Sequence, residues 1–182
     1  MELLSLKFAL FTLIVLVIYY FLPRRIQNYW LLFASYFFCF TISGKFALVM
    51  FAATAWNFFV AWRVRRKEGQ TSKFWLWLGI GGDLFAFLFF RLEASGYARG
   101  FFDYLFSIGH TDLLRFVLPI GFSFYIMQAI SYLIDVYRKQ TTVCYDFIDF
   151  ALYISYFPKL LAGPIERAKS FLPKLTQNRS VD

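Results

Sequence analysis

The chain has 182 residues, of which 60% are hydrophobic and 24% aromatic, including 26 Phe and 12 Tyr. A soluble domain of this length has too little interior to bury so much apolar surface, so the composition excludes a water-soluble globular protein and predicts an integral membrane protein. The formal net charge of +8 would suggest nucleic-acid binding in a soluble protein. Here the basic residues lie between apolar runs, where the orientation of membrane helices accounts for them, and we expect no nucleic-acid partner.

Five apolar runs follow one another along the chain. A bilayer core of about 30 Å requires roughly 20 helical residues. On this basis we predict transmembrane helices at residues 3–22, 26–43, 46–62, 74–90 and 116–137. The first run has no small-residue cleavage site after it, so we interpret it as an uncleaved helix and not as a signal peptide.

A sixth apolar segment, residues 147–162, is short for a span and carries Pro158 near its end. Proline removes a helix hydrogen bond, which favours a re-entrant helical hairpin. Broken backbone at membrane depth is tolerated only where protein or a water-filled cavity satisfies it. The expected fold class is therefore an all-α integral membrane protein with about five transmembrane helices and a re-entrant hairpin, forming part of a larger core.

Basic residues are distributed unevenly between alternate loops. The richer set should face the cytoplasm, which predicts a multi-pass protein of the plasma membrane with its N-terminus outside and residues 63–73 in a cytoplasmic loop. Residues 92–114 are then an outer loop containing an interfacial helix. The two sets are nine residues (Arg24, Arg25, Arg63, Arg65, Arg66, Lys67, Lys73, Arg138, Lys139) and five residues (Lys7, Lys45, Arg91, Arg99, Arg115).

Two polar residues lie inside predicted spans, Asn57 and Asp83. A carboxylate at mid-membrane costs roughly 2.5–3.5 kcal/mol on insertion scales, so Asp83 requires a partner or a wet cavity. Asn57 is one candidate partner, and we favour a helix-joining role for Asp83 over a proton relay. Cys39 and Cys144 predict neither a disulfide nor a metal site, because one lies in an apolar run and neither has neighbours at metal-ligand spacing.

The helix at residues 116–137 has two stripes on neighbouring faces. The first stripe is polar and contains Gly121, Tyr125, Gln128, Tyr132 and Asp135 at intervals of four and three residues. Lipid would not tolerate this row unless it faces protein or water, so we expect it to line a cavity. Asp135 also has a simpler role as a salt-bridge partner of Arg138 or Lys139. The second stripe is apolar and is expected to point outward (Phe122, Ile126, Ala129, Leu133, Val136).

The sequence around these stripes resembles the membrane-bound O-acyltransferase family, in the branch that acetylates alginate and related exopolysaccharides. The first block is PIGFSFY at residues 119–125 followed by QAISYLIDVYR at 128–138. The second block is DFALYI at 149–154 followed by FPKLLAGPIER at 157–167. Two ordered blocks over 50 residues make a specific signal, whereas upstream the resemblance is mostly hydropathy and helix spacing.

The resemblance implies transfer of an acyl group, expected to be acetyl, from an acyl-CoA or acyl-carrier thioester to a hydroxyl of an exported polysaccharide such as alginate. It also implies that partner proteins present the polysaccharide to the enzyme. No bound cofactor is expected, and the catalytic base would be a histidine. The only histidine, His110, falls in the predicted outer loop, so we expect the catalytic histidine beyond Asp182 and none in this chain, which would then be an N-terminal portion. The substrate-cavity candidates are Tyr125, Gln128, Tyr132, Asp135, Lys159, Gly163, Pro164, Glu166 and Arg167.

Two other functions remain open at this point. A short relative of these enzymes could serve as a non-catalytic membrane scaffold of a polysaccharide assembly. A transporter or channel module would also use the polar stripe, as the wall of a permeation path. The two blocks favour an acyltransferase or a scaffold over transport.

Overall fold

A computed structural model describes residues 6–66, 69–95, 121–158 and 167–176. Within these ranges the regular structure is helical, and no strand occurs. This agrees with the all-α class expected from the sequence. The helices are α1 (Leu6–Phe21), α2 (Arg24–Ile42), α3 (Gly44–Arg66), α4 (Gly69–Ser95), α6 (Gly121–Tyr137), α7 (Phe147–Ser155) and α9 (Ala168–Thr176).

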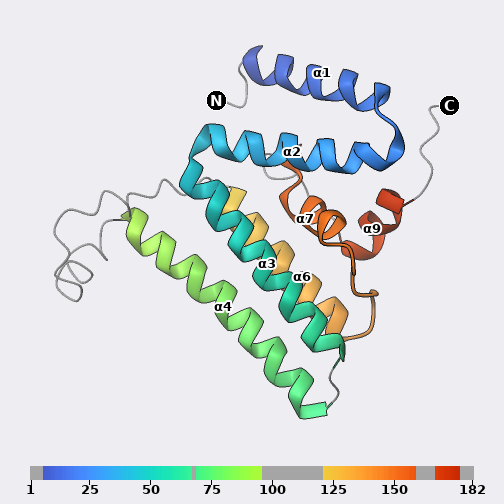
Figure 1. The fold of residues 1–182 in the computed structure, drawn as a ribbon. Helices are drawn as coiled ribbons and strands as arrows, with labels where there is room; N and C mark the ends of the chain where they lie inside the picture. Colours follow the sequence, from blue (N-terminus) through green and yellow to red (C-terminus); the bar gives the residue numbers. More distant parts are fainter. Residues whose placement is uncertain (1–5, 67–68, 96–120, 159–166, 177–182) are drawn as a thin grey trace.

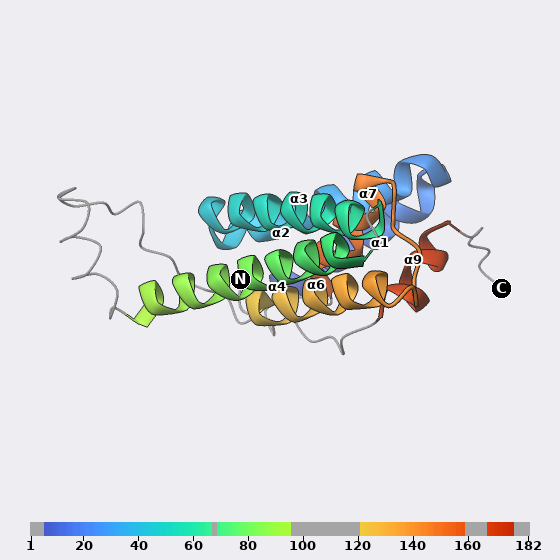
Figure 2. The ribbon, with the colours of Figure 1, turned by 90° about the horizontal axis from the view of Figure 1, so that it is seen from below.

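Three helices, α3, α4 and α6, run side by side and contact one another pairwise (Figures 1 and 2). α2 crosses the upper end of this group, with α1 packed along its far side, and the short helices α7 and α9 lie below α2. One core cluster fills the space between α3, α4, α6 and α7. A second cluster joins α1, α2, α7 and α9, and Phe157 packs there at 5.5 Å from the ring of Phe11.

Local sequence explains where the first helices end. Pro23 takes an extended conformation and becomes the N-cap of α2, because its ring cannot continue α1. The side-chain amide of Gln27 donates to the carbonyls of Tyr19 and Leu22, both at 3.2 Å, and so adds hydrogen bonds at the C-terminus of α1. Ser43 alone separates α2 from α3 in an extended conformation, so the chain changes direction within one residue.

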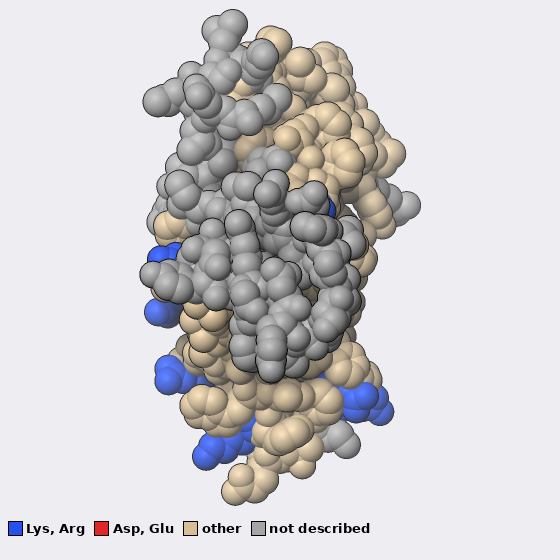
Figure 3. Space-filling view, turned by 90° about the vertical axis from the view of Figure 1, so that its left-hand side faces the viewer, with Lys and Arg blue, Asp and Glu red and all other residues tan. Residues whose placement is uncertain are grey.

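Among the described residues, two helices are long and apolar enough to cross a membrane, α3 and the part of α4 up to Leu92. In the described part of α1, residues 8–21 form a shorter apolar helix. Large apolar side chains stand exposed on the outside of the fold; Phe21 is 85% and Phe85 70% accessible. In Figure 3 the described part of one face is mostly uncharged, with Lys and Arg atoms chiefly in its lower half. An apolar exterior of this kind suits lipid and not water.

The basic segment at 63–73 is more helical than the sequence analysis expected. α3 continues to Arg66 and α4 begins at Gly69, so Arg63, Arg65 and Lys73 belong to helices and not to a long loop. Basic side chains suit the last turn of α3, where the free carbonyls carry partial negative charge. Gly69 has a φ of +63°, a conformation that most side chains disfavour, and this permits the short connection.

The α6 helix is also more enclosed than expected. The apolar stripe predicted to point outward is buried: Ile126 is 2% and Leu133 0% exposed. The prediction was wrong because α6 contacts α3, α4 and α7, which together cover both stripes. The exposed large side chains of α6 are instead Phe124, Met127 and Tyr137, and the first two lie on the side of the helix that neither stripe occupies.

Candidate functional site

The polar stripe of α6 is the centre of the candidate site. Tyr125 and Tyr132 are 1% exposed, Gln128 is 5% exposed and Asp135 is 8% exposed. These four side chains therefore lie within the protein, as their incompatibility with lipid required. Each of the first three has a hydrogen-bonding partner on a different element.

Tyr125 joins a chain of hydroxyl groups that links three helices. Its hydroxyl lies 3.3 Å from Oγ1 of Thr54 on α3, and the hydroxyl of Tyr36 on α2 lies 3.4 Å from the same atom. The Thr54 proton is directed at the carbonyl of Met50, 2.7 Å away. Because the threonine proton is used by Met50, a bond between the threonine oxygen and a tyrosine requires the tyrosine as donor. The Tyr125 hydroxyl also donates to the Met50 carbonyl, 3.5 Å away.

Gln128 and Tyr132 hold the segment that follows α6. The Gln128 amide donates to the carbonyl of Tyr153, in the last turn of α7, at 2.7 Å. The Tyr132 hydroxyl accepts from the backbone N–H of Cys144 at 3.0 Å, and its ring lies 4.9 Å from that of Phe150. These contacts give the stripe a packing role. Its assignment to a substrate cavity stays a prediction.

Asp135 has no ion pair with Arg138 or Lys139, although all three residues are described. Its carbonyl instead accepts from the N–H of Gln140 at 2.9 Å, while the N–H of Lys139 bonds to the carbonyl of Val136 at 3.1 Å. This pair of bonds is a Schellman motif, which closes the C-terminus of α6. The salt bridge considered for Asp135 from the sequence is therefore absent in the described part of the chain.

Asn57 and Asp83 meet between α3 and α4. The Asn57 amide donates to Oδ1 of Asp83 at 2.8 Å, and the two side chains are 0% and 1% exposed. This is the helix-joining pair that the sequence suggested. Oδ1 of Asn57, Oδ2 of Asp83 and Nε1 of Trp56 lack a hydrogen-bonding partner. Three unsatisfied buried atoms make this the most costly polar cluster in the described core.

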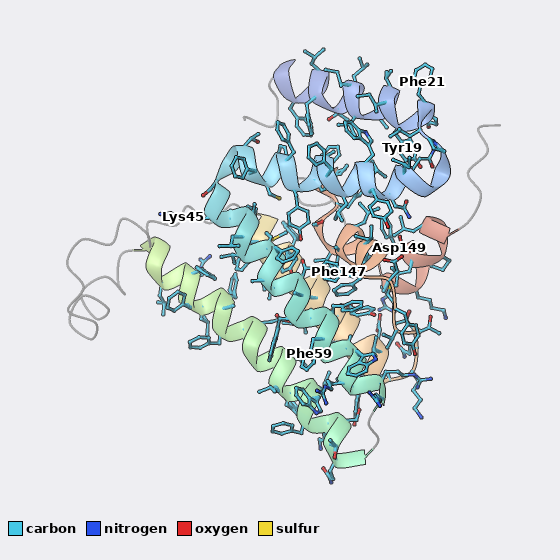
Figure 4. The ribbon with its side chains drawn as sticks, in the orientation of Figure 1. Tyr19, Phe21, Lys45, Phe59, Phe147 and Asp149 are labelled. Carbon is cyan, nitrogen blue, oxygen red and sulfur yellow. The ribbon has the colours of Figure 1, made fainter. Side chains whose placement is uncertain are left out.

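A third polar contact, unforeseen from the sequence, ties the start of the second motif block and the end of α9 to α2. The Asn28 amide donates to Oδ1 of Asp149 at 2.8 Å and to the carbonyl of Leu175 at 3.4 Å. Figure 4 shows Asp149 on α7, in the region where α2, α7 and α9 approach one another. Asn28 therefore bonds to helices on both sides of the segment that contains Gly163 and Pro164, which we call the Gly-Pro block.

The turn after α6 borders a hollow of about 460 Å³, which α7 and α9 complete. Thr141, Cys144, Asp149, Lys169 and Pro173 are among the residues that line it. Burial raises the pKa of the Cys144 thiol to about 11, and the nearby carboxylates act in the same direction. The thiol is therefore neutral near pH 7 and poorly suited to act as a nucleophile.

Four predicted site residues, Lys159, Gly163, Pro164 and Glu166, lie outside the described part of the chain, and so does His110. Arg167 is described and exposed, and its carbonyl accepts from the backbone of Ser170 at the start of α9. No group of three His, Cys, Asp or Glu side chains among the described residues could hold a metal ion.

Sequence reasoning missed Thr54, Tyr36 and Asn28. Thr54 could have been found, because it lies three residues before Asn57 and hence on the same face of its helix. Tyr36 and Asn28 gave no such signal. Tyr36 follows Ser35 within an apolar run and Asn28 follows Gln27 at the start of one, and the partner of each is distant in the sequence.

Comparison with curated proteins shows extended similarity to O-acetyltransferases. The chain is 37% identical over 171 residues to a probable alginate O-acetylase AlgI of Pseudomonas putida, covering 90% of this chain and 34% of that protein. It is 35% identical over 167 residues to the Pseudomonas aeruginosa protein of the same name, covering 90% of this chain and 32% of that protein. A peptidoglycan O-acetyltransferase of Helicobacter pylori is 27% identical over 173 residues, covering 80% of this chain and 32% of that protein.

These relatives confirm the resemblance to alginate O-acetylases that the two motif blocks indicate. The chain spans about one third of the length of each. No protein-family profile matches the chain, and no solved structure matches it. Together with the two membrane-length helices, the relatives identify a membrane protein.

Proposed function

We propose that this chain is one part of a membrane-bound O-acyltransferase, which moves an acetyl group from a thioester donor to a hydroxyl of an exported polysaccharide. The observation that carries the proposal is similarity to O-acetylases over nine tenths of the chain. The two motif blocks fall on α6 and on the α7 region, which lie against each other. An acyl-CoA or acyl-carrier protein would supply the acetyl group, and partner proteins would present the polysaccharide.

In this proposal the described residues form the support of the transfer site. The hydroxyl chain from Tyr36 to Tyr125 fixes α6 against α2 and α3, and Gln128 fixes it against α7. A histidine in the same enzyme would take the proton of the acceptor hydroxyl as its oxygen attacks the acyl carbonyl. A rigid support matters because transfer depends on holding acceptor and donor within a narrow range of distances.

We further propose five transmembrane helices and a re-entrant hairpin, with the N-terminus outside. The excess of basic residues at the junction of α3 and α4 supports this orientation. The test is labelling of single cysteines, at Gly69 and at Gly96, with an impermeant thiol reagent on intact cells, in a background without Cys39 and Cys144. Gly96→Cys should be labelled from outside and Gly69→Cys should not. The reverse pattern would invert the topology.

The activity is tested with a chimera. This chain replaces the segment that it matches in the Pseudomonas putida relative, and the acetyl-ester content of the alginate made by the cells is measured. The intact relative is the positive control, and the relative without its matching segment is the negative control. We expect the chimera to restore acetylation above the negative control, because the replaced segment would supply the same support.

A chimera that reaches the membrane in normal amounts and yields no acetyl ester would contradict the proposal. It would favour the alternative function of a non-catalytic scaffold. Membrane fractions probed for the chimera establish which case applies, since a misfolded chimera would be depleted from them.

A further inference from the structure

A second hollow, of about 410 Å³, lies where α3 ends and α4 begins. Its walls include Arg65 from α3, Gly69 and Ser72 from α4, and Lys139 from the turn that follows α6. The hollow therefore lies where the three bundle helices meet at one end. Its position depends on the α3–α4–α6 packing and not on a single surface loop.

The described residues that line this hollow carry charges of one sign. Arg65 and Lys139 come from separate elements, and no Asp or Glu occurs among these described residues. Two cations that border one hollow raise the local potential, and a bound anion relieves it. The hydroxyl of Ser72 is already used, since it donates to the carbonyl of Val64 at 2.8 Å. Recognition of an anion therefore depends on the two cations. The 460 Å³ hollow beside α7 differs, because Asp149 there offsets Lys169.

The backbone at Lys139 is unusual for a lysine. Its φ is +59°, and it occupies the position of the Schellman motif that proteins most often fill with glycine. A lysine here strains the backbone and adds nothing to the cap, because the motif uses only its N–H. The presence of a lysine at this position must therefore be explained by the surroundings of its side chain, which borders the hollow.

The hollow also lies at one end of the two helices that are long enough to cross a membrane, where a bilayer would place its lipid headgroups. α3 and α4 are the two membrane-length helices, and they meet at this end. Near the end of α3, the guanidinium of Arg63 lies 5.4 Å from the ring centroid of Trp62 and 5.2 Å from that of Trp75. Tryptophan and arginine gather at membrane–water interfaces in this way. Figure 3 shows Lys and Arg atoms toward the same end of the molecule.

We propose that this hollow binds the phosphate of an anionic lipid headgroup between Arg65 and Lys139. The lipid would fasten the α3–α4 junction to the turn after α6 at the membrane surface. A soluble phosphate could supply the same group, and the experiment separates these two sources.

The test uses the full 182-residue chain in phosphatidylcholine nanodiscs, with and without phosphatidylglycerol, and measures bound phosphatidylglycerol by native mass spectrometry. Arg65→Gln and Lys139→Gly should each weaken binding about fivefold. Lys139→Gly is informative because glycine suits the cap, so its melting temperature should be equal to or above that of the wild type. The matched control is Lys73→Gln, which removes an exposed charge from α4 outside the hollow.

Equal losses for Lys73→Gln and Lys139→Gly would overturn the proposal, because binding would then follow surface charge alone. Unchanged binding in both Arg65→Gln and Lys139→Gly would overturn it as well. Inorganic phosphate is added as a competitor in the second arm. Retention of the lipid supports the headgroup as the ligand, and displacement at low phosphate concentration would assign the same two cations to a soluble phosphate.

Discussion

Gly79 on α4 occupies the closest approach of three helices, and replacing it with alanine should loosen the bundle. A Cβ atom at this position would lie 2.7 Å from Cγ1 of Val60 on α3 and 2.8 Å from Cδ1 of Leu133 on α6. Both neighbours are fully buried. Carbon atoms in contact prefer about 3.5–4.0 Å, so α4 would have to move away by about 0.7 Å or more.

The cost can be set against a neighbouring glycine on the same helix. Val60 is β-branched and has little rotamer freedom, so it cannot turn aside cheaply. Overpacking of this kind costs about 1–3 kcal/mol. At Gly81 an added Cβ meets nothing within 4 Å, and Gly81→Ala should be neutral or stabilising. Helix propensity changes equally in both variants, so the difference between them isolates the clash.

The measurement is the free energy of unfolding in detergent micelles for each variant and for the double variant Gly79→Ala with Val60→Ala. We expect Gly79→Ala to lie about 1–3 kcal/mol below Gly81→Ala. The double variant should be less destabilised than the sum of its two single substitutions, because the shorter side chain makes room for the new methyl group. Equal stability of the two alanine variants would refute the packing argument.

Breaking the buried pair with Asp83→Leu should lower the free energy of unfolding by about 1–3 kcal/mol, because Asn57 loses its partner. In thermal unfolding experiments, the double variant with Asn57→Leu should recover part of this lost stability. In a background without Cys39, the rate at which iodoacetamide alkylates Cys144 should increase about tenfold per pH unit up to a pH of about 11. The reason is that the raised pKa of the thiol keeps the reactive thiolate scarce at lower pH, and a plateau of the rate by pH 9 would contradict the pKa shift. Gln128→Leu should reduce acetylation by the chimera more than it reduces membrane insertion, whereas Met127→Leu, a change on the exposed side of α6, should leave both nearly unchanged. Full activity of Gln128→Leu at equal expression would make the stripe ordinary packing.

The sequence predicted the helices well because long apolar runs have few alternative structures in a membrane. It also predicted that Tyr125, Gln128 and Tyr132 share one face, since helical periodicity fixes this independently of the rest of the chain. The Asn57–Asp83 pair could be anticipated for a related reason. Two isolated polar residues in neighbouring spans have few other partners.

Periodicity could not show how many neighbours a helix has. The second stripe of α6, with Ile126 and Leu133, has the composition of a lipid-facing surface and is nevertheless covered by protein. In a membrane protein the lipid side and the core side are both apolar, so the contrast that distinguishes them in a soluble helix is missing. The partners of Tyr36 and Asn28 depend on tertiary packing for the same reason, and only the fold shows them.

The two contacts of Asn28 have a consequence for the Gly-Pro block. One asparagine holds α7 through Asp149 and α9 through Leu175, so these two helices are joined through a single side chain of α2. The Gly-Pro block therefore connects two helices whose relative position is also set from outside the block, by α2.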